Sequence, residues 1–165
     1  MKTIICIDPG INGAIAWRDG TGEVGVISMP VTPKDILEAL INLTNGNDFC
    51  WLEAVGGYVP GNSGPAAVKF ARHCGHLEMA LLALNVSYNQ VLPLKWQSAV
   101  IGKPNYSKIP KETSPKERKR ILAERKTERK NKIKAKVQGL YPAIKVTLKN
   151  ADALAMLAWA SGDEK

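Results

Sequence analysis

The sequence predicts an α/β fold in which helices cover a mixed β-sheet, with a basic helical insertion. Three short strand-like segments follow one another at the start of the chain, which indicates an antiparallel meander. Two more alternate with helical patterns, and the order β-β-β-α-β-α-β-α favours a mixed sheet with helices on its faces. Strands are expected at residues 2–8, 13–18, 23–29, a segment ending at Glu53, and 86–92.

Local signals define where these elements begin and end. Pro9-Gly10 and Asp19-Gly20-Thr21-Gly22 supply turn chemistry after the first two strands. Thr32 and Pro33 are typical of an N-cap and a first helical residue. The helices expected before the basic segment span 33 to about 44, roughly 65–84, and a short stretch beginning near Pro93.

One segment holds most of the positive charge. The 165 residues include 23 Lys and Arg against 15 Asp and Glu, for a net charge of +8. Residues 103–136 contain 14 basic and 4 acidic residues, or +10, so the remainder carries −2. A basic element on a nearly neutral body predicts binding to a polyanion, most simply nucleic acid. A solvated helix kept for solubility is the alternative.

The basic segment is interpreted as an insertion at about 103–131. Residues 102–113 carry too many turn-forming residues for regular structure, whereas Ser114-Pro115-Lys116-Glu117 is a capping box. Apolar residues are sparse until Ile133, so the first turns of the following helix cannot bury a broad face. We therefore expect an arm that projects or lies along a partner. It should return to the core near Ile133, Val137 and Leu140.

Composition excludes membrane and secreted classes. No stretch approaches the roughly 20 apolar residues of a membrane span, and the N-terminus lacks the features of a secretory signal. The cysteines number three, and Cys6 and Cys50 lie in apolar runs, which indicates reduced thiols. We expect one domain over residues 1–165 in a cytoplasmic protein with no membrane contact. Bacterial, phage and viral origins are all compatible.

Three acids form the candidate site. Asp8 ends an apolar strand, Glu53 ends a second apolar run, and Asp152 opens an Ala/Leu-rich helix. Each acid alone has a structural reading, such as a turn for Asp8 and a favourable helix start for Asp152. Three carboxylates that converge repel one another, and a divalent cation is the usual remedy. Together they predict a metal-dependent phosphodiesterase.

Four motifs occur in a definite order along the chain. They are Ile7-Asp8-Pro9-Gly10-Ile11-Asn12-Gly13, Leu52-Glu53, Val91-Leu92-Pro93-Leu94-Lys95 and Ala151-Asp152-Ala153-Leu154-Ala155. In order and spacing they resemble the RuvC-type Holliday-junction resolvases of the RNase H-like superfamily. The resemblance covers most of the chain except about 103–130. It implies a five-stranded RNase H-like sheet with acids at one edge, and a homodimer that nicks two symmetry-related strands of a four-way DNA junction.

The resemblance also implies roles for individual residues. Two Mg²⁺ or Mn²⁺ ions would bind in each active site, with Asp8 bridging both while Glu53 and Asp152 each hold one. One ion would activate a water and the other would stabilise the leaving 3′ oxygen. Lys95, at the start of its helix, would offset charge on the scissile phosphate. A solvated first-turn lysine is the alternative for Lys95.

One position departs from the family pattern. The family generally has a fourth ligand, an acid or a histidine, three residues before the last aspartate, where this chain has Lys149 followed by Asn150. Asn150 is either a metal ligand or, as we prefer, the N-cap of the final helix. This departure leaves open a weakened second metal site, an altered ion preference or an inactivating Asp-to-Asn change at position 150. The alternatives are therefore a non-catalytic branched-DNA-binding protein, or an RNase H-like nuclease with another nucleic-acid substrate.

Candidate DNA contacts lie on three segments. Tyr58 belongs to the Gly/Pro-rich loop after Glu53, where the resemblance implies an aromatic that stacks on bases near the junction. An exposed loop tyrosine is the alternative. The remaining candidates are Lys69 and Arg72 on the following helix and Lys130 and Lys132 in the basic segment.

Overall fold

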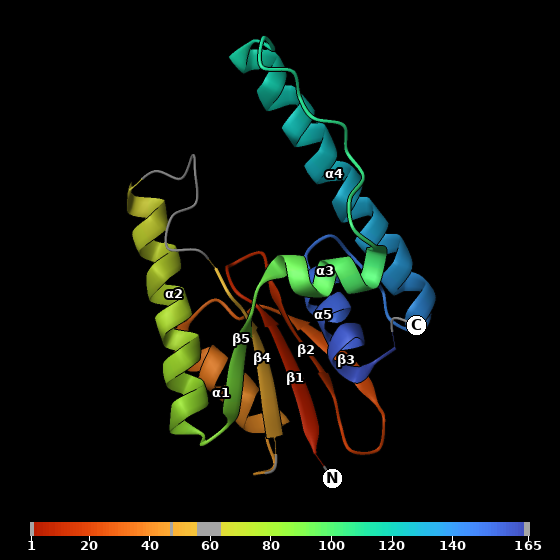
Figure 1. Ribbon diagram of the computed structural model, residues 1–165. Helices are drawn as coiled ribbons and strands as arrows, with labels where there is room; N and C mark the ends of the chain where they lie inside the picture. The colour runs from red at the N-terminus through yellow and green to blue at the C-terminus, as the bar shows by residue number, and fades with distance from the viewer. Residues whose placement is uncertain (1, 47, 56–63, 164–165) are drawn as a thin grey trace.

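The computed structural model describes residues 2–46, 48–55 and 64–163 (Figure 1). Within these residues five strands and five helices form an α/β fold, as the sequence predicts. In chain order they are β1 (Thr3–Asp8), β2 (Ala14–Arg18), β3 (Val24–Ser28), α1 (Pro33–Leu43), β4 (Asp48–Glu53), α2 (Gly64–Ala83), β5 (Ser87–Val91), α3 (Pro93–Ile101), α4 (Pro115–Leu140) and α5 (Ala151–Ser161).

The five strands form one mixed sheet in the order β3-β2-β1-β4-β5. The predicted meander is confirmed, since β1 pairs antiparallel with β2 and β2 with β3. In contrast, β4 runs parallel to both β1 and β5. Ile7 pairs with Leu52, so the next residue on each strand, Asp8 or Glu53, ends its strand at the same edge of the sheet.

Each face of the sheet covers its own hydrophobic core. Ile5 and Ile7 of β1 point toward α1 and α2, whereas Cys6 points to the opposite face, because successive side chains in a strand alternate. On the second face α5 packs directly on β1 and β2, with α3 and α4 beside it. Small residues let α5 approach closely: Ala153, Ala155 and Ala158 are fully buried.

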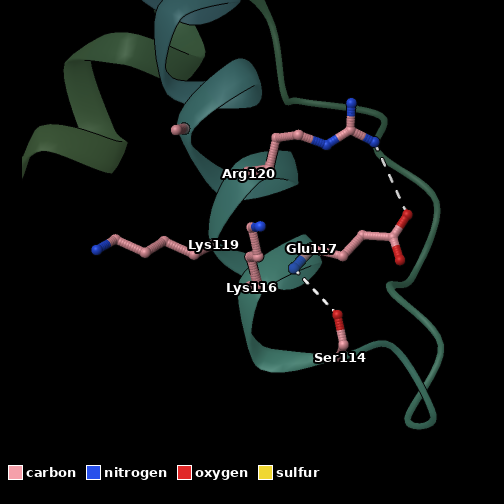
Figure 2. Close-up of a pocket in the computed structure, with 6 residues that line it drawn as sticks. Ser114, Lys116, Glu117, Lys119 and Arg120 are labelled. Carbon is pink, nitrogen blue, oxygen red and sulfur yellow. Dashed lines mark hydrogen bonds and ion pairs between the residues drawn. The ribbon is translucent and has the colours of Figure 1, made fainter.

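Helix α4 extends well beyond the body of the molecule (Figure 1). Its last turns return to the core as expected, since Ile133 and Val137 are buried and Leu140 packs partly against the same cluster. The Ser114 hydroxyl accepts a hydrogen bond from the Glu117 N–H (3.2 Å), which confirms the predicted N-cap (Figure 2).

The arm is a helix covered along one side by the chain that leads into it (Figure 1). The Tyr106 hydroxyl donates to the Arg125 carbonyl (3.2 Å), and the Arg125 guanidinium donates to the Ser107 carbonyl (2.8 Å) while lying 4.8 Å from the Tyr106 ring centre. Nearer the tip, Arg118 donates to the Pro110 carbonyl (3.1 Å). These contacts hold the irregular segment before α4 in place without secondary structure of its own.

None of the helices in the described part of the chain combines the length and the apolar character that crossing a membrane requires.

Candidate active site

The turn after β1 holds Asp8 at the edge of the sheet. Gly10 has φ +108°, a conformation that favours glycine, and its carbonyl accepts from the Gly13 N–H (2.9 Å). A Cβ on Gly13 would lie 2.0 Å from the Asp8 carbonyl oxygen. The backbone therefore folds back on Asp8 so tightly that only glycine fits at position 13. This close contact fixes the backbone position from which the Asp8 side chain extends.

The fold brings the three predicted acids into one electrostatic cluster. Asp8 and Glu53 end neighbouring parallel strands, and Asp152 lies in the first turn of α5, which packs on β1. All three are half-buried. Burial raises the pKa of Asp8 to about 8, and the carboxylates of Glu53 and Asp152 add to the rise. Burial and then Asp152 raise the pKa of Glu53 to about 7, and burial also raises the pKa of Asp152.

A fully buried tryptophan positions Glu53. The indole Nε1 of Trp96, on α3, donates a hydrogen bond to Glu53 Oε2 (3.2 Å), and this bond lowers the Glu53 pKa against the effect of burial. The sequence analysis did not select Trp96. The signal for it was weak, because a buried indole N–H needs a partner but the sequence does not say which.

Cations of α4 act electrostatically on the acids. Lys130 lowers the pKa of Asp8, and Arg129 with Lys130 lowers the pKa of Glu53. Lys130, Arg129 and Lys126 also lower the pKa of Asp152, against the larger effect of burial. Of these cations the sequence analysis named only Lys130. Arg129 and Lys126 were missed because the charge pattern of the arm does not reveal which side of the helix faces the sheet edge.

The donor chemistry of the cluster fits a hard divalent cation, but the side chains do not enclose one. Carboxylate oxygens are the ligands that Mg²⁺ and Mn²⁺ prefer, and their mutual repulsion would be relieved by such an ion. Nevertheless, within residues 2–46, 48–55 and 64–163 no group of three or more His, Cys, Asp or Glu side chains is arranged to hold a metal ion. Glu53, Asp8 and Asp152 interact across the edge without forming a closed ligand set.

Lys95 of α3 contacts an aromatic ring on α5. Its ammonium sits 5.4 Å from the centre of the Trp159 ring, a cation–π distance. Lys95 does not appear among the charges that shift the pKa values of Asp8, Glu53 and Asp152. Its role at the phosphate stays a prediction.

Asn150 occupies the N-cap position of α5, the alternative that the sequence favoured. Its side chain, however, does not form a capping hydrogen bond. Its Oδ1 instead accepts from the Thr147 N–H (2.7 Å), and its Nδ2 donates to the Lys145 carbonyl (3.1 Å). The hydrogen bond from Thr147 uses one of the two lone pairs of the oxygen. A role for Asn150 as a metal ligand stays a prediction.

The other DNA-contact candidates are dispersed. Tyr58 lies outside the described residues. Lys69 and Arg72 are exposed on α2, which packs against α1 on the other face of the sheet from α4. Lys132 is exposed and forms an ion pair with Glu128 (2.7 Å) one helical turn earlier. Of the cations predicted to bind DNA, the structure brings Lys130 to the acids.

The acid cluster should make the metal-free protein less stable at higher pH. In the unfolded chain Asp8 ionises near pH 4, whereas in the folded protein its pKa is about 8, so folding takes up a proton between these values. The free energy of unfolding should therefore fall from pH 4 to 8 and level off above. In the Asp8→Asn protein the fall should be smaller.

Urea unfolding in EDTA at pH 5 and pH 8 measures this difference between the two proteins. Thermal unfolding in the same buffers is a second measure, in which each kcal/mol of relative stabilisation by Asp8→Asn at pH 8 should raise Tm by about 2–4 °C. Equal pH dependence in both proteins would contradict the placement of Asp8 in the cluster.

Comparisons with known proteins identify the fold. No protein-family model matches this chain, and no curated protein sequence matches it. The solved structure of Thermus thermophilus RuvC aligns over 98% of this chain and 97% of its own, with 15% identity and a TM-score of 0.54. T. thermophilus RuvC in complex with a Holliday junction substrate aligns over 98% and 93%, with 15% identity and a TM-score of 0.56. The chain therefore has a RuvC-like, RNase H-like α/β fold.

Proposed function

We propose that this protein is a divalent-metal-dependent endonuclease that cuts branched DNA, with the four-way junction as its substrate. The observation that carries the proposal is the cluster of Asp8, Glu53 and Asp152, three half-buried acids with raised pKa values at one sheet edge. Three carboxylates at one edge repel one another, and a divalent cation would relieve that repulsion. The RuvC-like fold supports a nuclease, and one of the similar structures is bound to a Holliday junction.

Asp8, Glu53 and Asp152 are the residues that would hold Mg²⁺ or Mn²⁺. Such ions supply a water nucleophile at neutral pH and positive charge against the leaving 3′ oxygen. Asp8 would be the shared ligand of a two-ion site. Trp96 keeps the Glu53 carboxylate oriented through its 3.2 Å hydrogen bond, and the basic arm draws the DNA backbone toward the edge.

Symmetric cutting needs two sites, so we propose that the protein acts as a homodimer in which each copy nicks one strand. We also propose that residues 1–165 form a single nuclease domain with a basic insertion. The alternative of a non-catalytic binding protein is favoured by one observation. In the described residues the acids are not arranged as a closed ligand set.

One assay tests the proposal directly. The protein is incubated with a mobile four-way junction and Mg²⁺ or Mn²⁺, beside a linear duplex and an RNA–DNA hybrid of the same sequence. We expect paired nicks at symmetric positions on the junction and little cutting of the linear DNA. Binding without cutting under either ion would establish the non-catalytic alternative, and cutting of the hybrid alone would indicate another nucleic-acid substrate.

A further inference from the structure

Strand β4 is apolar on both of its faces, but in the described part of the chain no helix lies over one of them (Figure 1). Between its two terminal acids β4 has only apolar residues, a pattern typical of a strand buried on both sides. Cys50 and Leu52 are buried against α1 and α2 as this pattern predicts. Phe49 and Trp51 point to the opposite face, where α5 packs on β1 and β2, and both stay half-buried.

Three aromatic side chains form a connected row on this open face, and we call Phe49, Trp51 and Trp159 the aromatic row. The ring centres of Phe49 and Trp51 lie 5.3 Å apart and those of Trp51 and Trp159 lie 4.9 Å apart, each pair in edge-to-face contact. An open groove of about 250 Å³ runs beside the rings and is lined by Lys2, Ile4, Phe49, Trp51 and Ala160. The row therefore offers a ligand apolar ring surface.

The strand beside the row carries polar side chains on the same face. In the parallel pairing of β4 with β5, Phe49 lies opposite Ser87 and Trp51 lies opposite Asn89. Ser87 and Asn89 are both exposed, and their hydroxyl and amide groups can donate and accept hydrogen bonds. Aromatic rings on an open sheet are the means by which RNA-recognition domains stack the bases of a single strand.

A cation lies against each end of the row. The Lys2 ammonium is 4.9 Å from the centre of the Phe49 ring, and the Lys95 ammonium is 5.4 Å from the centre of the Trp159 ring. Positive charge beside flat apolar rings is complementary to a nucleic-acid strand, which has an anionic backbone and bases with flat faces. A second copy of this chain docked face to face would instead bring the same lysines together.

The row also leads to the acid cluster. Glu53 follows Trp51 by two residues on β4, so its side chain points to the same face about 7 Å further along the strand. A DNA strand held at the acids can therefore continue onto the row. Its nucleotides must be unpaired there, because the bases of a duplex stack on one another and not on protein side chains. A branch point is a place where such nucleotides arise.

We propose that the aromatic row is a binding site for single-stranded DNA, with bases stacked on its rings and the backbone in contact with Lys2. The identity of the ligand rests on the proposed function, since the bound strand is the one that runs from the acid cluster. The site holds unpaired nucleotides beside the bond to be cut, and it thereby favours branched over linear DNA.

The test makes the same substitution on opposite faces of the sheet. Trp51→Leu removes the central ring of the row, and Tyr88→Leu removes a half-buried ring of β5 that packs against the other core. Affinity is measured in EDTA for a labelled single strand of about 12 nucleotides and for a duplex of the same sequence. Trp51→Leu should bind the single strand about tenfold more weakly, the order of one lost stacking contact, and the duplex as before. Tyr88→Leu should change neither affinity, and Trp51→Phe should recover most of the loss.

The salt dependence tests the backbone contact. Lys2→Gln should lower the slope of log affinity against log salt for the single strand by about 0.7, the value of one phosphate contact. Lys34→Gln, the same change at an exposed position of α1, should leave the slope unchanged.

Tryptophan fluorescence keeps the test decisive even where Trp51→Leu lowers stability. The single strand should quench the fluorescence of the wild-type protein more than the duplex does. Trp159→Phe should remove part of this quenching, and Trp17→Phe, in the other core, should retain it. Absence of quenching in the wild-type protein would overturn the inference.

Three other results would each separate the possible ligands. Tighter binding of the row to an RNA strand of the same sequence would overturn the assignment to DNA. Unchanged single-strand affinity of Trp51→Leu, with conversion of a dimer to a monomer in analytical ultracentrifugation, would make the row a contact between copies and overturn the inference. A protein that binds the single strand through the row but cuts no junction would overturn the proposed function alone.

Discussion

Asp8→Asn should abolish junction cutting while leaving junction binding intact. Asn has nearly the same shape but lacks the negative charge that a shared metal ligand supplies. Loss of a residue that merely supports a ligand already costs about 10- to 100-fold. The cleavage rate of bound junction should therefore fall by at least about 100-fold. Affinity should be equal or higher, because one carboxylate fewer repels the DNA backbone.

The matched control is Asp35→Asn, which makes the same chemical change on an exposed position of α1. Single-turnover cleavage with Mn²⁺ and fluorescence anisotropy on the same labelled junction give the two quantities. Wild-type cutting by the Asp8→Asn protein would remove the acid cluster from the proposed mechanism. Loss of binding together with cutting would instead indicate damage to the fold.

Shortening the arm should weaken DNA binding and flatten its dependence on salt. The Tyr106 hydroxyl bonds to the Arg125 carbonyl, so a short Gly-Ser linker can join these positions and replace residues 107–124. That change removes six basic and three acidic residues, a net +3, and the cavity of about 500 Å³ at the tip. Each lost phosphate contact should lower the slope of log affinity against log salt by about 0.9.

The control for the shortened arm loses the same net charge from the body, through Lys34→Glu and Lys145→Gln. Circular dichroism and Tm show whether each protein keeps its fold. We expect the shortened protein alone to lose at least about tenfold in affinity at moderate salt. Unchanged affinity and salt slope would make the arm an element for dimerisation or a partner protein.

The order and bounds of the elements were predictable from local patterns. The turn residues after Asp8, the proline starts of α1 and α3 and the Ser114 cap each act over a few neighbouring residues, and the observed elements begin and end within one or two residues of expectation. The acids were identifiable for a similar reason, since each one ends or opens an apolar element. Asp8 and Glu53 then meet because parallel strands bring equivalent ends to one edge.

Side-chain partners across the fold were less predictable. The sequence suggested Lys95 as the phosphate-binding cation, which stays a prediction, but not that its ammonium lies 5.4 Å from the Trp159 ring on another helix. It left Asn150 as either ligand or cap; Asn150 takes the N-cap position, and its side chain bonds within the turn before α5. The Lys95 contact joins two helices far apart in sequence, which a local pattern cannot read.

The sequence by itself determined the α/β order, the three acids and the basic character of the arm. These follow from residue spacing, turn chemistry and charge, which are local properties of the chain. Only the tertiary structure decided that Trp96 orients Glu53 and that Lys126, Arg129 and Lys130 face the acids. Those residues are separated by tens of residues in sequence. The packing of α3, α4 and α5 on one face of the sheet brings them together.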